Sequence, residues 1–328
     1  MNEINIITKK HENKKKKTVK KKTVLKIIII LLITVIAAIA VLIKITPPPP
    51  QKPQMKVLPQ VDAVSVAIAD GNTGKFLGGK DSELRVYPAS TTKILTCIIA
   101  LEEGHDKLND NALITPNATK QDGTCLGLKP DLPISLQELL YGMMLVSGND
   151  AAVSVAETVG GDYETFIKLM NAKAKNIGAV NSNFVNANGL TDKNHYTTAS
   201  DMAKIAVYAM KNQNFRKIVK EPFHMMTYRD GTIRRIENRN EFLESGYEGA
   251  NGIKTGMTEA AGDCLVASAE REGHLVVVSI YNDENRWEDV KKLLDYGFDA
   301  IKNEEMYEKA MREEPFVYKV VNRIMGNE

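Results

Sequence analysis

The sequence predicts an α+β fold: a mixed antiparallel sheet with flanking helices, beside an all-helical lobe. Alternating apolar residues, typical of strands with one buried face, occur near both ends of the globular part, at 63–77 and 249–281. Between them, residues 135–212 repeat apolar side chains at helical spacing. We therefore expect strands from both halves of the chain to form one sheet, with helices on its faces and in a second lobe.

The individual elements follow from local patterns. A hairpin is predicted first, with strands at 63–69 and 75–77 around a turn rich in Asp, Gly and Asn. An apolar run after Pro88 predicts a buried helix over 90–101. Four more helices are expected, the last with a capped start at Asp201: 136–145, 151–159, 163–177 and 200–210. Beyond Phe215 the pattern changes to strands, and an amphipathic helix is expected at about 286–300.

The N-terminus joins a basic segment to an apolar one. Residues 1–26 hold ten Lys and two Glu, a balance of +8, so the remainder carries −6 of the net +2. The next 17 residues, 27–43, contain no charge and no proline, and with its flank the segment 27–45 can span a bilayer. Because lysines precede the span, we predict that residues 1–26 lie in the cytoplasm and that the chain beyond the span lies on the outer side of the membrane.

Two alternatives remain for this end of the chain. Ala38 and Ala40 have the spacing that signal peptidase reads, so cleavage after Ala40 would release the protein from the membrane. A lysine run can also bind nucleic acid, but here it adjoins a membrane segment, and no nucleic-acid partner is expected. Retention as an anchor is the preferred interpretation, and both membrane readings export residues 57–302.

Three further segments complete the predicted organisation. Residues 46–56 are rich in proline and form a linker, because proline excludes helix and central strand. Residues 57–302 form the globular domain, and residues 303–328 form a short C-terminal tail.

The five histidines show no paired ligand spacing, so no metal or other cofactor is expected. The three cysteines are odd in number and far apart, which implies no disulfide framework.

The first candidate site is Ser90-Thr91-Thr92-Lys93. On a helix, Ser90 and Lys93 lie on one face, and Ser90 in the first turn lies near the positive end of the helix dipole. A serine hydroxyl needs a base to act as a nucleophile. Lys93 can be that base if burial or a neighbouring cation such as Lys254 lowers its pKa. Taken alone, the motif is more typical of a capped helix start with a surface lysine.

The second and third candidate segments are Ser147-Gly148-Asn149 and Lys254-Thr255-Gly256. The first lies between two predicted helices, where Ser147 would relay a proton to a leaving group and Asn149 would hold a substrate amide. The second reads as an edge strand, with Lys254 and Thr255 facing a carboxylate and Gly256 leaving room for a substrate strand. Each alone also fits an ordinary turn.

The order and spacing of the three motifs resemble the penicillin-recognising serine acyl-transferases, and most closely the D-alanyl-D-alanine carboxypeptidases among the low-molecular-mass penicillin-binding proteins. The resemblance covers roughly residues 57–302. Six further segments carry it: Tyr87 to Ser90, Leu140 to Met143, Asn149 to Ala152, Ala187 to Leu190 with His195, Thr198 to Asp201, and Lys254 to Val266.

The resemblance implies a β-lactamase/transpeptidase-like fold with the site in the cleft between its lobes. It implies removal of the terminal D-Ala from peptidoglycan pentapeptides through an acyl-enzyme on Ser90, which β-lactam antibiotics would also acylate. It places the oxyanion hole at the backbone N–H groups of Ser90 and Met257, and it suggests that Arg286 binds the substrate's terminal carboxylate. For Arg286, a solvated helix-start arginine is the alternative.

Other functions share parts of this pattern. A β-lactamase would use the same motifs, but no Glu-x-x-Leu-Asn segment follows Ser147. A penicillin sensor would need a larger cytoplasmic region than residues 1–26. A Ser-His-Asp hydrolase is disfavoured because no Gly-x-Ser-x-Gly segment occurs and His195 has no evident partner role. Relatives with a C-terminal β-rich domain differ, because the tail is too short for one, so the N-terminal segment is expected to be the anchor.

Overall fold

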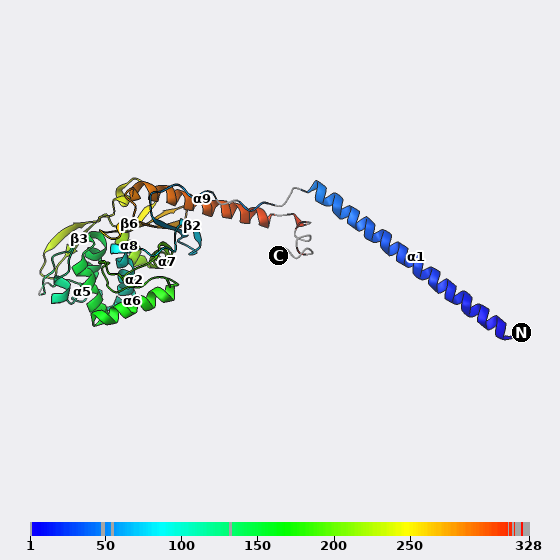
Figure 1. The fold of residues 1–328 in the computed structure, drawn as a ribbon, viewed down its shortest axis with the longest axis horizontal. Helices are drawn as coiled ribbons and strands as arrows, with labels where there is room; N and C mark the ends of the chain where they lie inside the picture. The colour runs from blue at the N-terminus through cyan, green and yellow to red at the C-terminus, as the bar shows by residue number, and fades with distance from the viewer. Residues whose placement is uncertain are drawn as a thin grey trace. The chain divides into compact units, whose positions relative to one another are not determined.

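The computed structural model describes residues 2–46, 50–53, 56–130, 133–313, 315, 316, 318 and 323. Its chain divides into two compact units, one of Met1–Gln54 with Asn303–Glu328 and one of Met55–Lys302 (Figure 1). The first unit contains helix α1 (Asn2–Ile45). The second contains the sheet and the helices around it, and it carries all three candidate motifs.

A five-stranded sheet forms the centre of the second unit. Its order is β2-β1-β7-β6-β5, and each neighbouring pair is antiparallel. The strands are β1 (Ser65–Asp70), β2 (Phe76–Lys80), β5 (Ala250–Thr258), β6 (Gly262–Arg271) and β7 (His274–Tyr281). The N-terminal hairpin joins the C-terminal strands where β1 pairs with β7. This confirms the α+β fold and the sheet built from both halves of the chain.

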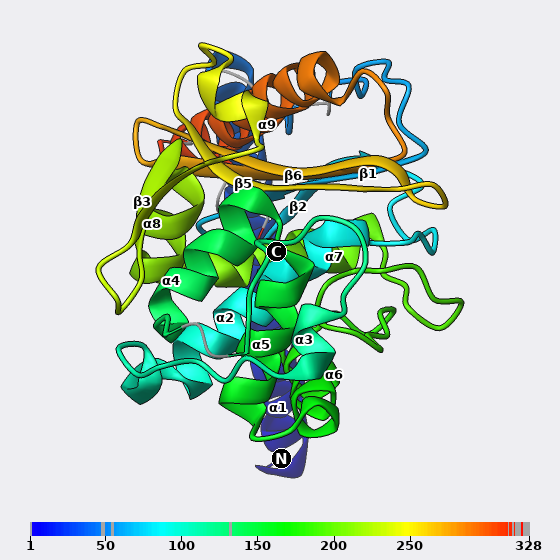
Figure 2. The same ribbon diagram turned by 90° about the vertical axis from the view of Figure 1, so that its left-hand side faces the viewer.

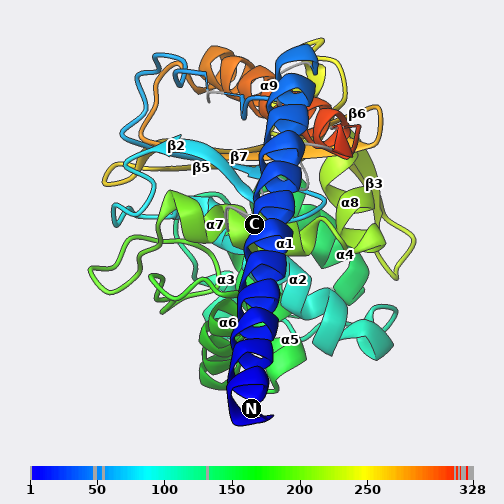
Figure 3. The ribbon, with the colours of Figure 1, turned by 90° about the vertical axis from the view of Figure 1, so that its right-hand side faces the viewer.

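Both faces of the sheet are covered, because side chains alternate along each strand. On β1, Ala67 and Ala69 belong to the core shared with the helical lobe, whereas Val66 and Ile68 pack on the opposite face. That opposite face is covered by α9 (Arg286–Arg312). Figure 2 shows α9 on one side of the sheet and the helices of the helical lobe on the other, and Figure 3 shows the same layers from the opposite direction.

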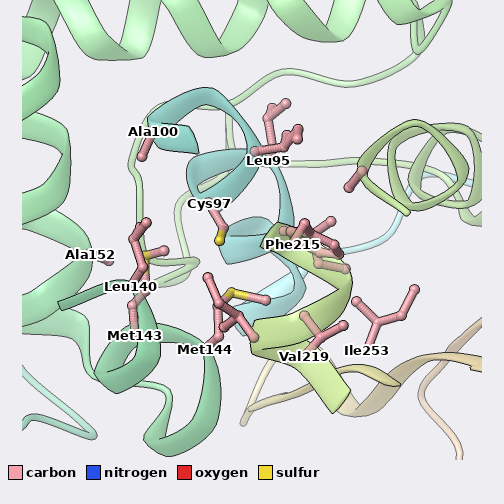
Figure 4. Packing of buried hydrophobic residues seen from close by; sticks show 14 of the residues in the cluster. Leu95, Cys97, Ala100, Leu140, Met143, Met144, Ala152, Phe215, Val219 and Ile253 are labelled. Atoms are coloured by element: carbon pink, nitrogen blue, oxygen red, sulfur yellow. The ribbon is translucent and has the colours of Figure 1, made fainter. Parts of the chain in front are cut away.

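Helix α2 (Lys93–Glu103) lies at the centre of the helical lobe, and its residues Lys93 to Leu101 are all buried. Figure 4 shows Leu95 and Cys97 of α2 among side chains from neighbouring helices and from β5. The surrounding helices are α3 (Pro116–Thr119), α4 (Leu136–Tyr141), α5 (Asn149–Gly160), α6 (Tyr163–Ile177), α7 (Ala199–Ala209) and α8 (Gln213–Lys220). A helix buried on all sides is well suited to hold a residue in one position.

Several predicted elements change in detail. Residues 136–145 are not one α-helix, because α4 ends at Tyr141 and a π-helical turn, Gly142–Val146, follows. The cap of α7 is Thr198, whose side chain accepts from the N–H of Asp201, so the prediction that Asp201 caps this helix is wrong. Helix α9 extends to Arg312 instead of ending near 300.

The prediction that strands begin directly beyond Phe215 is also wrong. Helix α8 occupies Gln213–Lys220, with Asn212 as its cap and with Phe215, Ile218 and Val219 buried. Its single buried stripe of three residues is too short to be recognised from periodicity. The strands that follow form a separate hairpin, β3 (Phe223–Thr227) and β4 (Ile233–Glu237), beside the helical lobe.

Gly297 allows α9 to lie close to the sheet. A Cβ at this position would lie 2.5 Å from Cγ1 of Val276 and 3.1 Å from Cγ2 of Ile68. Both neighbours belong to the buried layer between α9 and the sheet, so they have little space to move.

We predict that Gly297→Ala destabilises the domain by about 1–3 kcal/mol, because overpacking outweighs the better helix propensity of alanine. Urea unfolding of the detergent-solubilised chain measures the effect. Glu288→Ala on the exposed side of the same helix is the control and should stay within about 0.5 kcal/mol of the parent. Equal stability of Gly297→Ala and the parent would contradict the prediction, because it would show that α9 can move away from the sheet at no cost in free energy.

Candidate active site

Ser90 lies in a 3₁₀ turn, η1 (Ala89–Thr92), directly before α2. The turn is compact because Thr91 Oγ1 donates to the carbonyl of Pro88 at 2.7 Å and Ala89 adopts a left-handed φ of 46°. The predicted helix over 90–101 therefore begins three residues late, at Lys93. Ser90 is part-exposed at this turn, whereas the residues on both sides of it are buried.

Two buried side chains hold the turn from outside. Thr91 Oγ1 lies 3.1 Å from the hydroxyl of Tyr281 at the end of β7. Thr92 Oγ1 lies 2.8 Å from Nε2 of His195. Nδ1 of His195 accepts from the N–H of Val185 at 3.1 Å, so Nε2 carries the proton and donates to Thr92.

His195 therefore has a structural partner, and the expectation that it has no evident partner role needs correction. Burial lowers the pKa of His195 to about 4, so the ring is neutral near pH 7 and its donor to Thr92 is fixed. The contact between Thr92 and His195 could not be predicted from local sequence patterns, because the two residues are 103 positions apart.

Lys93 Nζ is fully buried and has three oxygen neighbours. It lies 2.9 Å from Ser90 Oγ, 2.7 Å from Asn149 Oδ1 and 2.6 Å from the carbonyl of Asn188. The carboxamide of Asn149 has a fixed orientation, because its Nδ2 donates to the carbonyl of Asp122 at 2.6 Å. Two of the three neighbours are thus obligate acceptors and take two N–H groups of Lys93.

Burial and, second, the charge of Lys254 hold the pKa of Lys93 well below its ordinary value. A neutral amine has two hydrogens and one lone pair. Because Asn149 and Asn188 accept the two hydrogens, the lone pair of Lys93 points to Ser90 Oγ. This geometry suits removal of the Ser90 proton by Lys93.

Ser147 and Asn149 come from the junction between the π-helical turn and α5. Ser147 adopts a left-handed φ of 71°, Gly148 caps α5, and Asn149 is its first residue. The change of helix type turns the chain at this point, so that Asn149 reaches Lys93. Within the described part of the chain, the Ser147 hydroxyl has no hydrogen-bond partner, and its residue is 6% exposed.

Lys254 and Gly256 bring the edge strand β5 to the same place. A Cβ on Gly256 would lie 3.1 Å from Cβ of Ala89 and 3.2 Å from the backbone nitrogen of Ser90, so β5 lies directly against the η1 turn. Lys254 is buried, and Nζ donates to the carbonyl of Thr255 at 3.1 Å. Burial, followed by the charges of Arg239 and Arg286, lowers the pKa of Lys254 to about 7.

Thr255 and Met257 flank Gly256 on β5. Thr255 is part-buried, while Met257 is 66% exposed at the end of the strand. The register pairs Met257 with Asp263 and Thr255 with Leu265 of β6, which leaves the other edge of β5 toward η1. In the described residues, neither side chain bonds another residue of the three motifs.

Arg286, the first residue of α9, joins the site through β5 and β6. Its Nη1 donates to Asp263 Oδ1 at 2.6 Å and to the carbonyl of Gly256 at 3.4 Å. The side chain is 15% exposed, and Nε is buried without a partner among the described residues. The alternative of a solvated helix-start arginine is therefore wrong.

The site also contains groups that the three motifs did not indicate. Arg239 bonds Thr124 Oγ1 at 2.9 Å and lies close enough to Lys254 to lower its pKa. Asn188, within the Ala187 to Leu190 segment, supplies a carbonyl to Lys93. Backbone contacts and distant charges of this kind leave no mark in the spacing of residues. Within the described ranges, no cluster of His, Cys, Asp and Glu is placed to hold a metal ion.

Comparison with known proteins agrees with this geometry. Residues 51–285 match the family of D-alanyl-D-alanine carboxypeptidases, Peptidase S11. The D-alanyl-D-alanine carboxypeptidase DacF of Bacillus subtilis is 33% identical over 256 residues, which are 76% of this chain and 65% of that protein. The D-alanyl-D-alanine carboxypeptidase DacB2 of Mycobacterium tuberculosis is 35% identical over 249 residues, which are 74% of this chain and 84% of that protein.

Solved structures give the same result for the fold. The crystal structure of the Streptomyces K15 DD-transpeptidase superposes with a TM-score of 0.69 at 31% identity, covering 74% of this chain and 100% of that one. The β-lactamase/transpeptidase-like architecture predicted from the motifs is thereby confirmed. The protein belongs to the D-alanyl-D-alanine carboxypeptidase family.

Proposed function

We propose that the protein is a serine-type D-alanyl-D-alanine carboxypeptidase that removes the terminal D-Ala from peptidoglycan pentapeptides. One observation carries the proposal: Ser90 Oγ lies 2.9 Å from the buried amine of Lys93, whose two N–H groups are taken by other acceptors. Family membership and the neighbouring motifs support it. The chain spans 65% of the Bacillus relative, so the activity is proposed for the domain that they share.

In the proposed acylation step, Lys93 takes the proton of Ser90 as Oγ attacks the carbonyl carbon of the penultimate D-Ala. The peptide C–N bond then breaks, and the leaving D-Ala nitrogen receives, through Ser147, the proton that Lys93 took from Ser90. An acyl-enzyme ester on Ser90 remains, and water hydrolyses it. The position of Ser147, which is buried and lies two residues from the Asn149 that bonds Lys93, supports the proton relay.

The developing negative oxygen would be held by the backbone N–H groups of Ser90 and Met257. The contact of Gly256 with the backbone of Ser90 supports this, because it keeps β5 and η1 close enough to share one oxygen. Donors aimed at such an oxygen contribute roughly 3–4 kcal/mol to the transition state. Asn149 would hold the substrate amide on the opposite side of the cleft.

The terminal carboxylate of the substrate would lie near Lys254 and Thr255. Arg239 and Arg286 add positive charge there, as their effect on the pKa of Lys254 indicates. Because Arg286 is already bonded to Asp263, we propose that it acts on the carboxylate mainly through its field. β-Lactams, which carry an amide and a carboxylate at similar spacing, would acylate Ser90 by the same route.

We further propose that α1 anchors the protein in the membrane. The helix contains one segment long and apolar enough to cross a bilayer, and its apolar side chains are exposed. The lysines before it favour a cytoplasmic N-terminus, which places the catalytic domain at the outer face, where peptidoglycan is accessible. Because the lysines flank a membrane segment, no nucleic-acid partner is needed to explain them.

Ser90→Ala should abolish both D-Ala release and penicillin acylation, because it removes the only atom that forms the ester. Release from diacyl-Lys-D-Ala-D-Ala and labelling by a fluorescent penicillin measure the two. Thr91→Ser in the same turn is the control and should retain both. Labelling of the wild type without release would leave a sensor or a transpeptidase, and absence of both would contradict the proposal.

For the wild type, kcat/KM should fall about tenfold per pH unit above about pH 7, because the free enzyme loses the Lys254 charge that attracts the carboxylate. In Lys254→Arg the guanidinium stays charged, so this basic limb should disappear even if the rate is lower. D-Ala release across the pH range gives both profiles. A wild-type profile without this limb would show that Lys254 does not bind as a cation.

Protein recovered from membranes should retain residues 1–40, because the apolar run continues past Ala40. Intact mass spectrometry decides this. A mature chain that starts at Val41 would show that the segment is a signal peptide and that the domain is released.

A further inference from the structure

Polar side chains along one face of α5 form hydrogen bonds to the segment 113–128, which precedes this helix in the sequence. Asp150, Ser154, Glu157 and Thr158 recur at helical spacing, and all but Ser154 bond this segment. Thr158 Oγ1 accepts from the N–H of Leu113 at 2.9 Å. Glu157 accepts from Thr115 Oγ1 at 2.6 Å and from Asn117 Nδ2 at 2.8 Å. The segment from Leu113 onward is thus attached by side chains instead of by a sheet.

Asp150 makes the most complete of these attachments. Oδ1 accepts from the N–H of Leu126 at 2.8 Å, and Oδ2 accepts from Gly127 at 2.9 Å and Leu128 at 3.1 Å. Oδ1 also accepts from the N–H of Ala151 at 2.8 Å. Gly127 has a φ of 79°, which turns three successive N–H groups to one carboxylate. Asp150 is 2% exposed, so no water replaces these donors.

The loop fixed in this way touches Asn149. The N–H of Asn149 donates to the carbonyl of Thr124 at 2.7 Å, and Nδ2 donates to the carbonyl of Asp122 at 2.6 Å. The second bond orients the carboxamide so that Oδ1 faces Lys93. A displaced loop would leave the carboxamide free to rotate, and Lys93 would lose one of its two acceptors.

The same loop covers the turn that contains Ser147. A Cβ on Gly148 would lie 3.0 Å from Cγ of Leu126, and one on Gly142 would lie 2.4 Å from Cδ1 of Leu126. Leu126 is buried, and its own N–H is held by Asp150. Its side chain therefore packs against Gly142 at the start of the π-helical turn and against Gly148, directly after Ser147.

We propose that Asp150 is a positioning residue for the reaction: by binding the N–H groups of Leu126 to Leu128, it fixes the loop that orients Asn149 toward Lys93 and covers the Ser147 turn. Asp150 contacts neither the nucleophile nor the base. This inference rests on the proposed carboxypeptidase function, which supplies the roles of Lys93, Ser147 and Asn149.

The charge of Asp150 also acts on Lys93. Among the described residues, four ionisable groups interact electrostatically with the amine: Lys254 from β5, Asp150 from α5, Cys125 from the loop, and His195, which is neutral near pH 7. Lys254 lowers the pKa of Lys93, whereas Asp150 raises it. Because only the neutral Lys93 can take the proton of Ser90, the rate should fall at low pH, where the amine is protonated. Neutralising Asp150 would let Lys93 lose its proton at a lower pH, so this acid limb of the rate profile would move to lower pH.

The test is Asp150→Asn in the full chain, in detergent, with the wild type measured beside it. The variant keeps the shape but places an NH₂ group against backbone N–H donors. We expect kcat/KM for D-Ala release to fall by about 10- to 100-fold, since small displacements of reacting groups have this effect. We also expect the acid limb to shift to lower pH. Titration with fluorescent penicillin counts folded sites, so that rates are compared per competent molecule.

Glu157→Gln is the matched control, because it changes the other buried carboxylate on this face of α5, which among the described residues bonds Thr115 and Asn117 alone. Its rate should stay within about threefold of wild type with an unmoved acid limb. An Asp150→Asn enzyme with wild-type rates, or a loss of rate with an unmoved limb, would overturn the proposal. An inactive wild type that penicillin does not label would instead overturn the proposed function.

Hydrogen exchange of the wild type tests the attachment without any variant. The amides of Leu126, Gly127 and Leu128 should be protected about as well as the interior of α5, because they donate to a buried carboxylate. Exchange as fast as that of an exposed loop would overturn the proposal, even if Asp150→Asn failed to fold.

Discussion

The site depends on one buried amine and on what surrounds it. Lys93 has no contact with solvent, and its nitrogen lies within 2.9 Å of three oxygen atoms from the η1 turn, α5 and the 187–190 segment. Burying an ammonium ion is costly, so the surroundings favour the neutral form, and a neutral amine can remove a proton from serine. Each of the elements around it supplies either an acceptor that orients the amine or a charge that changes its pKa.

The helical lobe and the sheet each contribute a different part of the surroundings of Lys93. Helix α2 is enclosed on all sides, so Lys93 at its start cannot reach water. The edge strand β5 contacts the η1 turn through Gly256 and brings Lys254 as the second cation. On the other side, α5 begins with Asn149 and Asp150, one directed to Lys93 and the other to the backbone of the neighbouring loop. The contact with Lys93 and the attachment of the loop thus begin on consecutive residues of one helix.

Individual elements show which parts of this were predictable. Helix α6 occupies Tyr163–Ile177 as its apolar spacing indicated, because its pattern is long and has one buried face. Helix α8 was missed because eight residues with three buried ones carry too little periodicity. The π-helical turn at Gly142–Val146 was also missed, since its residues fit an α-helix equally well. At its first residue, Gly142, the side chains of Leu126 and Met226 leave no room for a Cβ, and the helical pattern of the sequence does not reveal this contact.

The sequence by itself determined the α+β architecture and the three motifs, and it led to the proposal of Ser90 as nucleophile and Lys93 as base, because strand and helix periodicity and the Ser90–Lys93 spacing are local properties. Only the tertiary structure decided that His195 donates to Thr92, that Arg286 is bonded to Asp263 and Gly256, and that Asp150 binds three N–H groups of a loop. These contacts join residues 22 to 103 positions apart. They depend on how the elements pack, and no pattern along a single chain specifies which buried polar groups will satisfy one another.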